Sequence, residues 1–250
     1  MKKHIPNFIT SLNLLCGCIA LFFAFSNELI TASVFVFLGI FFDFFDGFFA
    51  RLLHVQSKVG MELDSLADVV TSGVVPGVVM MQLLSESLFG VPYSIDIFKS
   101  ADWQSGIVVF LPFIGLFIAV AAAYRLAKFN VDTRQTDQFI GMPTPAVSIW
   151  TLSIPLILVY QNSVFLENLF LNTYFLIGFT LVVSVLMNME LPLFALKFKN
   201  WSWSDNKIRY SFLLLSVLGM VLLKFIAIPL ILILYIVLSV ISRKTKRTSL

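Results

Sequence analysis

Long runs of apolar residues, separated by short polar stretches, dominate the pattern along the chain. A helix needs about 20 mainly apolar residues to cross the hydrocarbon core of a membrane. Runs of about this length nearly use up the 250 residues, which predicts an all-α, polytopic transmembrane bundle of about eight spans. The fifth and the last run are short, so six or seven spans stay open. The predicted spans cover residues 9–25, 29–53, 66–84, 106–129, 145–160, 169–187, 208–226 and 228–241.

The composition places the chain in a membrane rather than in water. Hydrophobic residues make up 59% of it and charged residues 12%, and the mean hydropathy is +0.94. Soluble domains carry about 25% charged residues, so a soluble class is excluded. Linkers rich in proline or serine are missing between the apolar runs. We therefore expect a single integral-membrane domain over residues 1–250.

The basic residues fall on one side of the predicted bundle. With eight spans and a cytoplasmic N-terminus, every Lys and Arg except Lys99 and Lys224 lies in a cytoplasmic segment or at its edge. Positive residues are retained on the cytoplasmic side of short loops, which predicts that both termini are cytoplasmic and that the protein lies in the cytoplasmic membrane. The net charge of +3 is then concentrated at one face, where anionic membrane lipids attract it. Nucleic acid is not an expected partner.

Four aspartates lie at the cytoplasmic ends of the second and third predicted spans: Asp43, Asp46, Asp64 and Asp68. An ionised carboxylate at membrane depth costs several kcal/mol unless it is paired, hydrated or bound to a cation. Carboxylates in such a place are therefore candidates for function. A site at the cytoplasmic mouth of the bundle follows from their position.

The spacing of these residues gathers them into two helical stripes. At about 100° per residue, Asp46 lies about 60° from Asp43, and three further small or polar residues share its side of the helix. On the next span, Gly60, Asp64 and Asp68 follow at four-residue steps. The short connection over residues 52–59 allows the two helices to run antiparallel. The first stripe consists of Asp43, Asp46, Gly47, Ala50 and Arg51.

Oxygen ligands without a nearby cysteine or a convincing histidine favour a hard divalent ion, Mg²⁺ or Mn²⁺, over Zn²⁺. Two ions bridged by carboxylates are expected, and the usual work of such a pair is phosphoryl chemistry. A different interpretation also fits four acids in a membrane: a cation-coupled transporter with an ion path or proton relay.

The pattern Asp43-x2-Asp46-Gly47-x2-Ala50-Arg51-x8-Gly60-x3-Asp64-x3-Asp68 resembles the signature of the CDP-alcohol phosphotransferase family at every defined position. The resemblance implies a membrane transferase in which an alcohol attacks the phosphorus attached to a lipid and CMP leaves. It implies that Asp43, Asp46 and Asp64 bind metal, and that Asp68 is the general base and also lies close to the metals. Nucleotide and pyrophosphate contacts are implied for Gly47, Ala50, Arg51 and Gly60.

Two further stretches resemble the phosphatidylserine synthase branch of this family: residues 5–17, and residues 125–130 followed by 139–145. This resemblance implies CDP-diacylglycerol and L-serine as substrates, with phosphatidylserine and CMP as products. Glycerol phosphate, inositol phosphate or another alcohol stays open as the acceptor. Relatives often form homodimers, which adds a second copy of the chain to the expected partners.

The polar residues of these stretches carry weaker predictions. Thr10 and Asn13 share a helical stripe and are expected to face the cytoplasmic pocket and contact the nucleotide, or to form hydrogen bonds between helices. Arg125 and Lys128 lie at the cytoplasmic end of the fourth span. They are expected to hold a carboxylate or phosphate of the acceptor, or to anchor the helix at the lipid headgroups.

Overall fold

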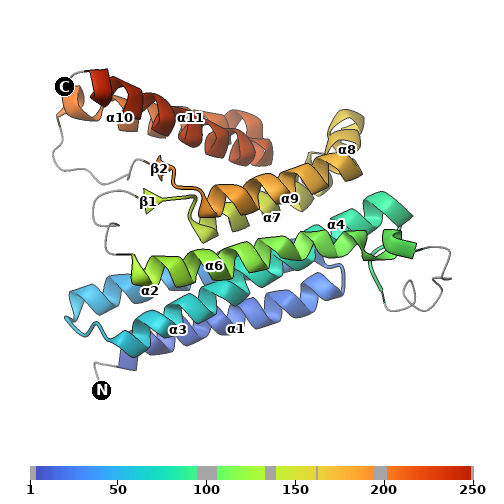
Figure 1. The fold of residues 1–250 in the computed structure, drawn as a ribbon, viewed down its shortest axis with the longest axis horizontal. Helices are drawn as coiled ribbons and strands as arrows, with labels where there is room; N and C mark the ends of the chain where they lie inside the picture. The colour runs from blue at the N-terminus through green and yellow to red at the C-terminus, as the bar shows by residue number, and fades with distance from the viewer. Residues whose placement is uncertain (1–3, 95–105, 133–138, 162, 194–201, 249–250) are drawn as a thin grey trace.

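The fold is a bundle of antiparallel helices in three layers (Figure 1). The computed structural model describes residues 4–94, 106–132, 139–161, 163–193 and 202–248. The elements are α1 (Ile5–Phe25), α2 (Leu29–Leu52), α3 (Lys58–Asp68), the π-helical η2 (Val69–Val74), α4 (Val75–Phe89), the 3₁₀-helical η3 (Gly106–Leu116), α6 (Phe117–Val131), β1 (Phe139–Ile140), α7 (Thr144–Tyr160), α8 (Val164–Phe170), α9 (Thr173–Asn188), β2 (Pro192–Leu193), α10 (Trp203–Leu223), η4 (Lys224–Ile226) and α11 (Ala227–Thr248).

The all-α prediction is confirmed. The first layer contains α1, α2, the α3–η2–α4 helix and α6; α7 and α9 form the second, and α10 and α11 the third (Figure 1). The N-terminal end of α1 and the C-terminal end of α11 lie at the same end of the bundle, together with the α2–α3 connection and the β1–β2 pair. The predicted basic residues at positions 2, 3, 99, 134, 197 and 199 lie outside the described residues.

Each of the eight predicted apolar segments overlaps a helix. Within the described ranges, five helical stretches are long and apolar enough to cross a membrane, and a sixth counts if the bent α8–α9 pair is one span. The protein is therefore an integral membrane protein. The number of crossings and the cytoplasmic position of both termini stay predictions.

The last of these apolar stretches, Asn206–Ile241, is a hairpin. Its backbone reverses at Lys224, whose φ of 53° and ψ of −129° are far from helical values. The rings of Phe212 and Tyr235 then lie 5.7 Å apart, centroid to centroid, across the two helices. Gln161, at the end of α7, holds the reversal: its amide donates to Leu223 O at 2.9 Å and accepts from Ile226 N at 2.8 Å.

The predicted boundaries were wrong in the sixth span. The apolar run predicted one helix over residues 169–187, whereas α8 and α9 meet at a bend of 58°. The Asn172 side chain accepts a hydrogen bond from Phe175 N at 3.1 Å and starts a new helix there. A cap inside an apolar run is hard to distinguish from a polar residue within a helix, because the hydrophobic pattern continues on both sides.

The helix that runs from α3 through η2 to α4 is the centre of the bundle. In its most apolar window, 78% of the residues are buried, against 6% in the α10–α11 hairpin. Glycines let its neighbours approach it closely. A Cβ on Gly39 of α2 would lie 2.7 Å from Thr71 Cγ2 and 2.9 Å from Asn13 Oδ1, and a Cβ on Gly17 of α1 would collide with the Thr71 hydroxyl. Small residues thus bring α1, α2 and η2 into contact beside the aspartates.

A short clip holds the segment between α6 and α7 against the end of α9. Antiparallel β1 and β2 pair Phe139 with Leu193 and Ile140 with Pro192. Next to them, Gly141 N donates to Leu191 O and Met142 N to Leu186 O, each at 2.9 Å. Gly141 has a φ of 75°, and a Cβ there would collide with Met187 O, so this position requires glycine.

We expect Gly17→Ala to destabilise the protein, because the added methyl group meets Thr71 in a packed contact between two helices. Overpacking of this kind costs about 1–3 kcal/mol, which outweighs the helix propensity of alanine, about 1 kcal/mol over glycine. Thermal unfolding of the purified protein in detergent measures the change. Gly178→Ala in α9 is the matched control, since a Cβ there meets nothing within 4 Å and its midpoint should equal or exceed that of the wild type. Equal midpoints for the two variants would contradict the packing argument.

Candidate metal centre and acceptor pocket

Three carboxylates meet where α2 and α3 lie side by side. Asp43 and Asp46 come from the last turns of α2, and Asp64 comes from α3. One carboxylate oxygen of each lies within 4.8 Å of those of the other two. The α2–α3 connection sets this geometry: the Ser57 side chain accepts from Gly60 N at 3.0 Å and starts α3 directly after the turn. Of the four carboxylates that the two stripes were expected to bring together, the structure gathers these three within 4.8 Å of one another.

The trio fits a divalent cation. Asp46 Oδ2 and Asp64 Oδ1 are buried and have no hydrogen-bond partner in the described part of the chain. The Asp43 and Asp64 carboxyl groups interact directly with each other. Buried acceptors without donors are costly, and negative charges so close together repel one another. An oxygen-ligated cation such as Mg²⁺ or Mn²⁺ would satisfy both demands at once.

Asp68 is not one of the trio, but its charge interacts with those of all three members, and it also has a hydrogen-bond partner of its own. It ends α3 where the π-helical turn begins, is 8% exposed, and accepts a hydrogen bond from Asn13 Nδ2 at 3.3 Å. The Thr71 hydroxyl donates to the backbone oxygen of Asn13 at 3.2 Å and joins the same two helices. The Asp68 carboxylate is therefore oriented by α1. Its predicted role as a metal ligand stays a prediction.

The polar stripe of α1 lies behind the aspartates. Asn13 is fully buried, and its bond to Asp68 confirms the alternative of hydrogen bonding between helices. Thr10 is also buried; its hydroxyl donates to Pro6 O at 3.0 Å and its side chain interacts with the Asp46 carboxylate. Both residues of α1 thus interact with an aspartate of the site: Asn13 with Asp68, and Thr10 with Asp46. Nucleotide contact by either of them stays a prediction.

The four small or basic residues of the signature differ in their surroundings. A Cβ on Gly60 would lie 3.0 Å from Asn7 Oδ1, so this glycine lets α3 approach α1. On Gly47 a Cβ would meet only the Arg51 guanidinium, at 3.8 Å, so packing does not require that glycine. Arg51 is exposed, and its Nε donates to Gly47 O at 2.9 Å. The space around a Cβ on Gly47 is therefore open except for the Arg51 side chain, and Ala50 is half-buried.

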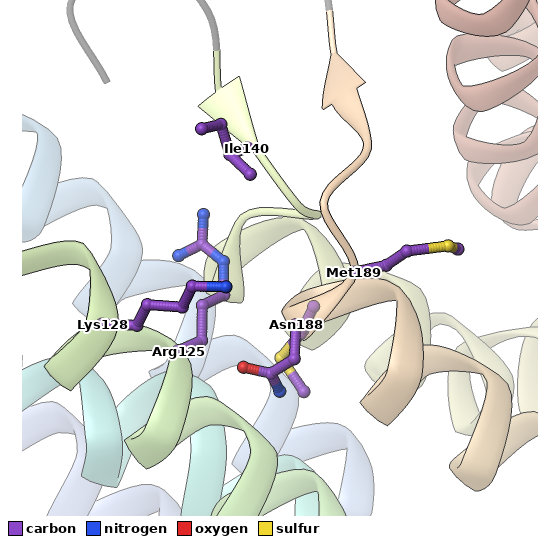
Figure 2. A pocket seen from close by; sticks show the side chains of 6 residues that line it. Arg125, Lys128, Ile140, Asn188 and Met189 are labelled. Carbon is purple, nitrogen blue, oxygen red and sulfur yellow. The ribbon is translucent and has the colours of Figure 1, made fainter. Parts of the chain in front are cut away.

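Arg125 and Lys128 line a pocket between the end of α6 and the β1–β2 clip (Figure 2). Arg125 is only 7% exposed, its Nε has no partner among the described residues, and its charge interacts with that of Asp68. Lys128 Nζ lies 3.6 Å from Glu190 Oε1 at the exposed mouth. The other lining residues are Ile140, Met187, Asn188 and Met189.

Asn188 was not predicted from the sequence. Its only signal is a polar residue directly after the predicted span 169–187, which is ordinary at the end of a helix. The clip brings it opposite Arg125, which precedes it by more than 60 positions. Only the folded chain places these two residues in one pocket.

Comparisons with known proteins match most of the bundle to one family. The sequence model of the CDP-alcohol phosphatidyltransferase family matches residues 3–194, from α1 to β2, and ends before the α10–α11 hairpin. A CDP-diacylglycerol–serine O-phosphatidyltransferase of Bacillus subtilis is 36% identical over 147 residues, 57% of this chain and 70% of the relative. An enzyme of the same name from Helicobacter pylori strain J99 is 33% identical over 204 residues, 80% of this chain and 74% of the relative.

The matched region contains both the carboxylate trio and the pocket at Arg125. The family model and the relatives match most of the bundle. The matched part includes the signature that begins at Asp43. This chain therefore belongs to the CDP-alcohol phosphatidyltransferase family.

Proposed function

We propose that this protein transfers a phosphatidyl group from CDP-diacylglycerol to the hydroxyl of L-serine, forming phosphatidylserine and releasing CMP. The observation that carries the proposal is the convergence of Asp43, Asp46 and Asp64 beside a separately oriented Asp68. The relatives named CDP-diacylglycerol–serine O-phosphatidyltransferase support serine as the acceptor.

Asp43, Asp46 and Asp64 would hold the divalent ions, Mg²⁺ or Mn²⁺, and two ions are proposed. The bound ions would neutralise the pyrophosphate and favour ionisation of the attacking hydroxyl. The carboxylates contribute a fixed arrangement of oxygens, because the α2–α3 connection and the glycine contacts with α1 hold the two helices together.

Asp68 would act as the general base. The serine hydroxyl oxygen forms a bond to the phosphorus attached to the lipid, the bond between that phosphorus and the CMP oxygen breaks, and Asp68 takes the hydroxyl proton. The bond from Asn13 Nδ2 to Asp68 Oδ1 holds the carboxylate in one orientation, which favours transfer to a defined oxygen. Direct attack needs no enzyme nucleophile.

The remaining site residues would bind the two substrates. Gly47, Ala50, Arg51 and Gly60 are proposed to contact the nucleotide and its pyrophosphate; the exposed Arg51 and the open surroundings of Gly47 support this assignment. Arg125 and Lys128 are proposed to bind the acceptor. Arg125 supports this assignment because it lines the pocket and also interacts with Asp68, the proposed base.

The site is proposed to face the cytoplasm, in the cytoplasmic membrane. The described basic residues outside the hairpin turn, including Arg51, Lys58, Arg125 and Lys128, lie at the end of the bundle that carries the aspartates, and Lys224 lies at the opposite end. The positive-inside rule assigns the richer end to the cytoplasm. Lipid substrate would then enter from the bilayer, and serine from the cytoplasm.

A divalent ion should stabilise the protein through the trio. Mn²⁺ at about a hundred times its dissociation constant stabilises a folded state by about 2.7 kcal/mol, so the unfolding midpoint of purified protein should rise and return when EDTA is added. Asp64→Asn should lose this response. Glu62→Gln should keep it, because Glu62 is an acid of the same helix that lies outside the trio. An undiminished response in Asp64→Asn would contradict the assignment.

Purified protein should release CMP from CDP-diacylglycerol when serine and Mn²⁺ or Mg²⁺ are supplied. Loss of a general base slows such a reaction by about 10²–10⁴-fold, which is the decrease expected for Asp68→Asn while Glu62→Gln retains activity. Release with glycerol phosphate or inositol phosphate but not with serine would keep the family reaction and overturn the acceptor. Folded protein that releases no CMP but moves cations across vesicles would favour a transporter.

The orientation can be measured with cysteine labelling in a chain that carries Cys16→Ala and Cys18→Ala. Glu28 and Lys58 are both exposed and lie at opposite ends of the bundle. In intact cells, an impermeant maleimide should label Glu28→Cys and should reach Lys58→Cys only after lysis. The reverse pattern would place the aspartates on the outer face.

A further inference from the structure

Asn188 has a fixed amide orientation. Its Nδ2 donates two hydrogen bonds to backbone oxygens, to Ala121 O at 3.0 Å and to Ser184 O at 3.2 Å. A flipped amide would bring Oδ1 against those two oxygens, acceptor against acceptor, so the flip is disfavoured. The two bonds therefore leave Oδ1 as the group that has to find a donor elsewhere.

That donor is missing among the described residues. Asn188 Oδ1 is buried and makes no hydrogen bond, although the residue lines a pocket that is also lined by two basic side chains, Arg125 and Lys128 (Figure 2). Lys128 instead extends toward Glu190, at 3.6 Å. Leaving a buried carbonyl without a donor is unfavourable. The pocket has an accessible volume of about 10 Å³, room for about one water molecule, so a ligand N–H group reaches this oxygen only after the surrounding side chains move apart.

The pocket offers two different recognition elements. On one wall, the buried Arg125 guanidinium attracts an anion, and its Nε is without a partner in the described part of the chain. From α9, Asn188 Oδ1 offers a neutral acceptor, and the Lys128–Glu190 pair borders the opening. An α-amino acid in its zwitterionic form carries a carboxylate and an ammonium group on neighbouring carbons, and these match a guanidinium and a carbonyl oxygen.

We propose that this pocket binds the amino-acid acceptor and that Asn188 Oδ1 accepts a hydrogen bond from its ammonium group, which makes Asn188 a specificity-determining residue. The inference rests on the proposed function and extends it to a residue outside the family signature. The interaction of Arg125 with Asp68 connects the pocket to the base, because the guanidinium that holds the carboxylate lies beside the group that takes the hydroxyl proton.

The position of Asn188 depends on the clip. The hydrogen bonds Gly141 N to Leu191 O and Met142 N to Leu186 O, with the β1–β2 pair, join the segment after α6 to the end of α9. Ile140 then lies on the side of the Arg125 guanidinium, whereas Lys128 stays at the exposed mouth (Figure 2). An apolar cover strengthens hydrogen bonds and charge interactions beneath it by excluding water.

The test compares two acceptors, L-serine and 3-hydroxypropionate, which is serine without its amino group. CMP release gives kcat/KM for each with the wild type, Asn188→Leu and Gly178→Ala. A hydrogen bond to a charged group is worth about 1.5–3 kcal/mol, so the wild type should prefer serine by about tenfold or more. Asn188→Leu should lose most of this preference, mainly through a higher KM for serine, and should keep its KM for CDP-diacylglycerol.

Gly178→Ala is the matched control, because Gly178 lies in the same helix as Asn188, outside the pocket, and a Cβ there meets nothing within 4 Å. It should retain the wild-type preference. Equal use of the two acceptors by the wild type would overturn the inference. So would an unchanged preference in Asn188→Leu, or a preference that disappears in Glu190→Gln instead.

The two proposals fail in different ways. Absence of serine-dependent CMP release from the wild type contradicts the proposed function. An active wild type whose preference does not depend on Asn188 contradicts only the further inference. If Asn188→Leu does not fold, thermal unfolding of the wild type with each acceptor, CMP and Mn²⁺ is the test. Serine should raise the unfolding midpoint more than 3-hydroxypropionate does. Equal shifts would overturn the inference.

Discussion

The contact between α1 and the central helix at Asn13, Asp68 and Thr71 is the constraint on which the site depends. Asn13 donates from its side chain to Asp68 and accepts with its backbone oxygen from Thr71, so one residue of α1 holds two successive turns of the central helix. The glycines at positions 17 and 39 make this contact close enough to form. In a membrane, where water cannot substitute, such a buried polar contact fixes the register of the helices.

The π-helical η2 directly after Asp68 belongs to the same arrangement. A π turn inserts an extra residue into a helix and changes the direction of the side chains that follow, and such turns are frequent at functional sites. Here it separates α3, which carries Asp64 and Asp68, from α4, which is almost entirely buried. The helix therefore carries its aspartates at one end and a buried, mainly apolar segment further in.

The carboxylates and the pocket at Arg125 divide the chemistry between two parts of the bundle. The trio is formed by α2 and α3, which are neighbours in the chain and meet through a five-residue turn. The pocket is formed by α6, the clip and the end of α9, which come together only when the second layer packs on the first. Asp68 and Arg125 connect the two parts through their charges. Under the proposed function, the two substrates would bind to different parts of the bundle.

Sequence alone determined the class of fold, the approximate positions of the helices and the trio of aspartates. These features depend on local pattern: apolar runs of membrane length, and carboxylates at helical spacing on two segments joined by a short turn. A turn this short requires the two helices to run antiparallel, so Asp43, Asp46 and Asp64 lie close together. The family signature could be read for the same reason, because all its positions lie within this one hairpin.

Only the tertiary structure decided what lies around that hairpin. Three features leave no mark on the hydrophobic pattern of the sequence. They are the hydrogen bond between Asn13 and Asp68, the bend at Asn172 and the turn of the last hairpin at Lys224. Asn188 became a candidate because the clip places it opposite Arg125. Hydrophobic periodicity records which residues avoid water and says nothing about which distant polar groups meet, since that depends on how whole helices pack.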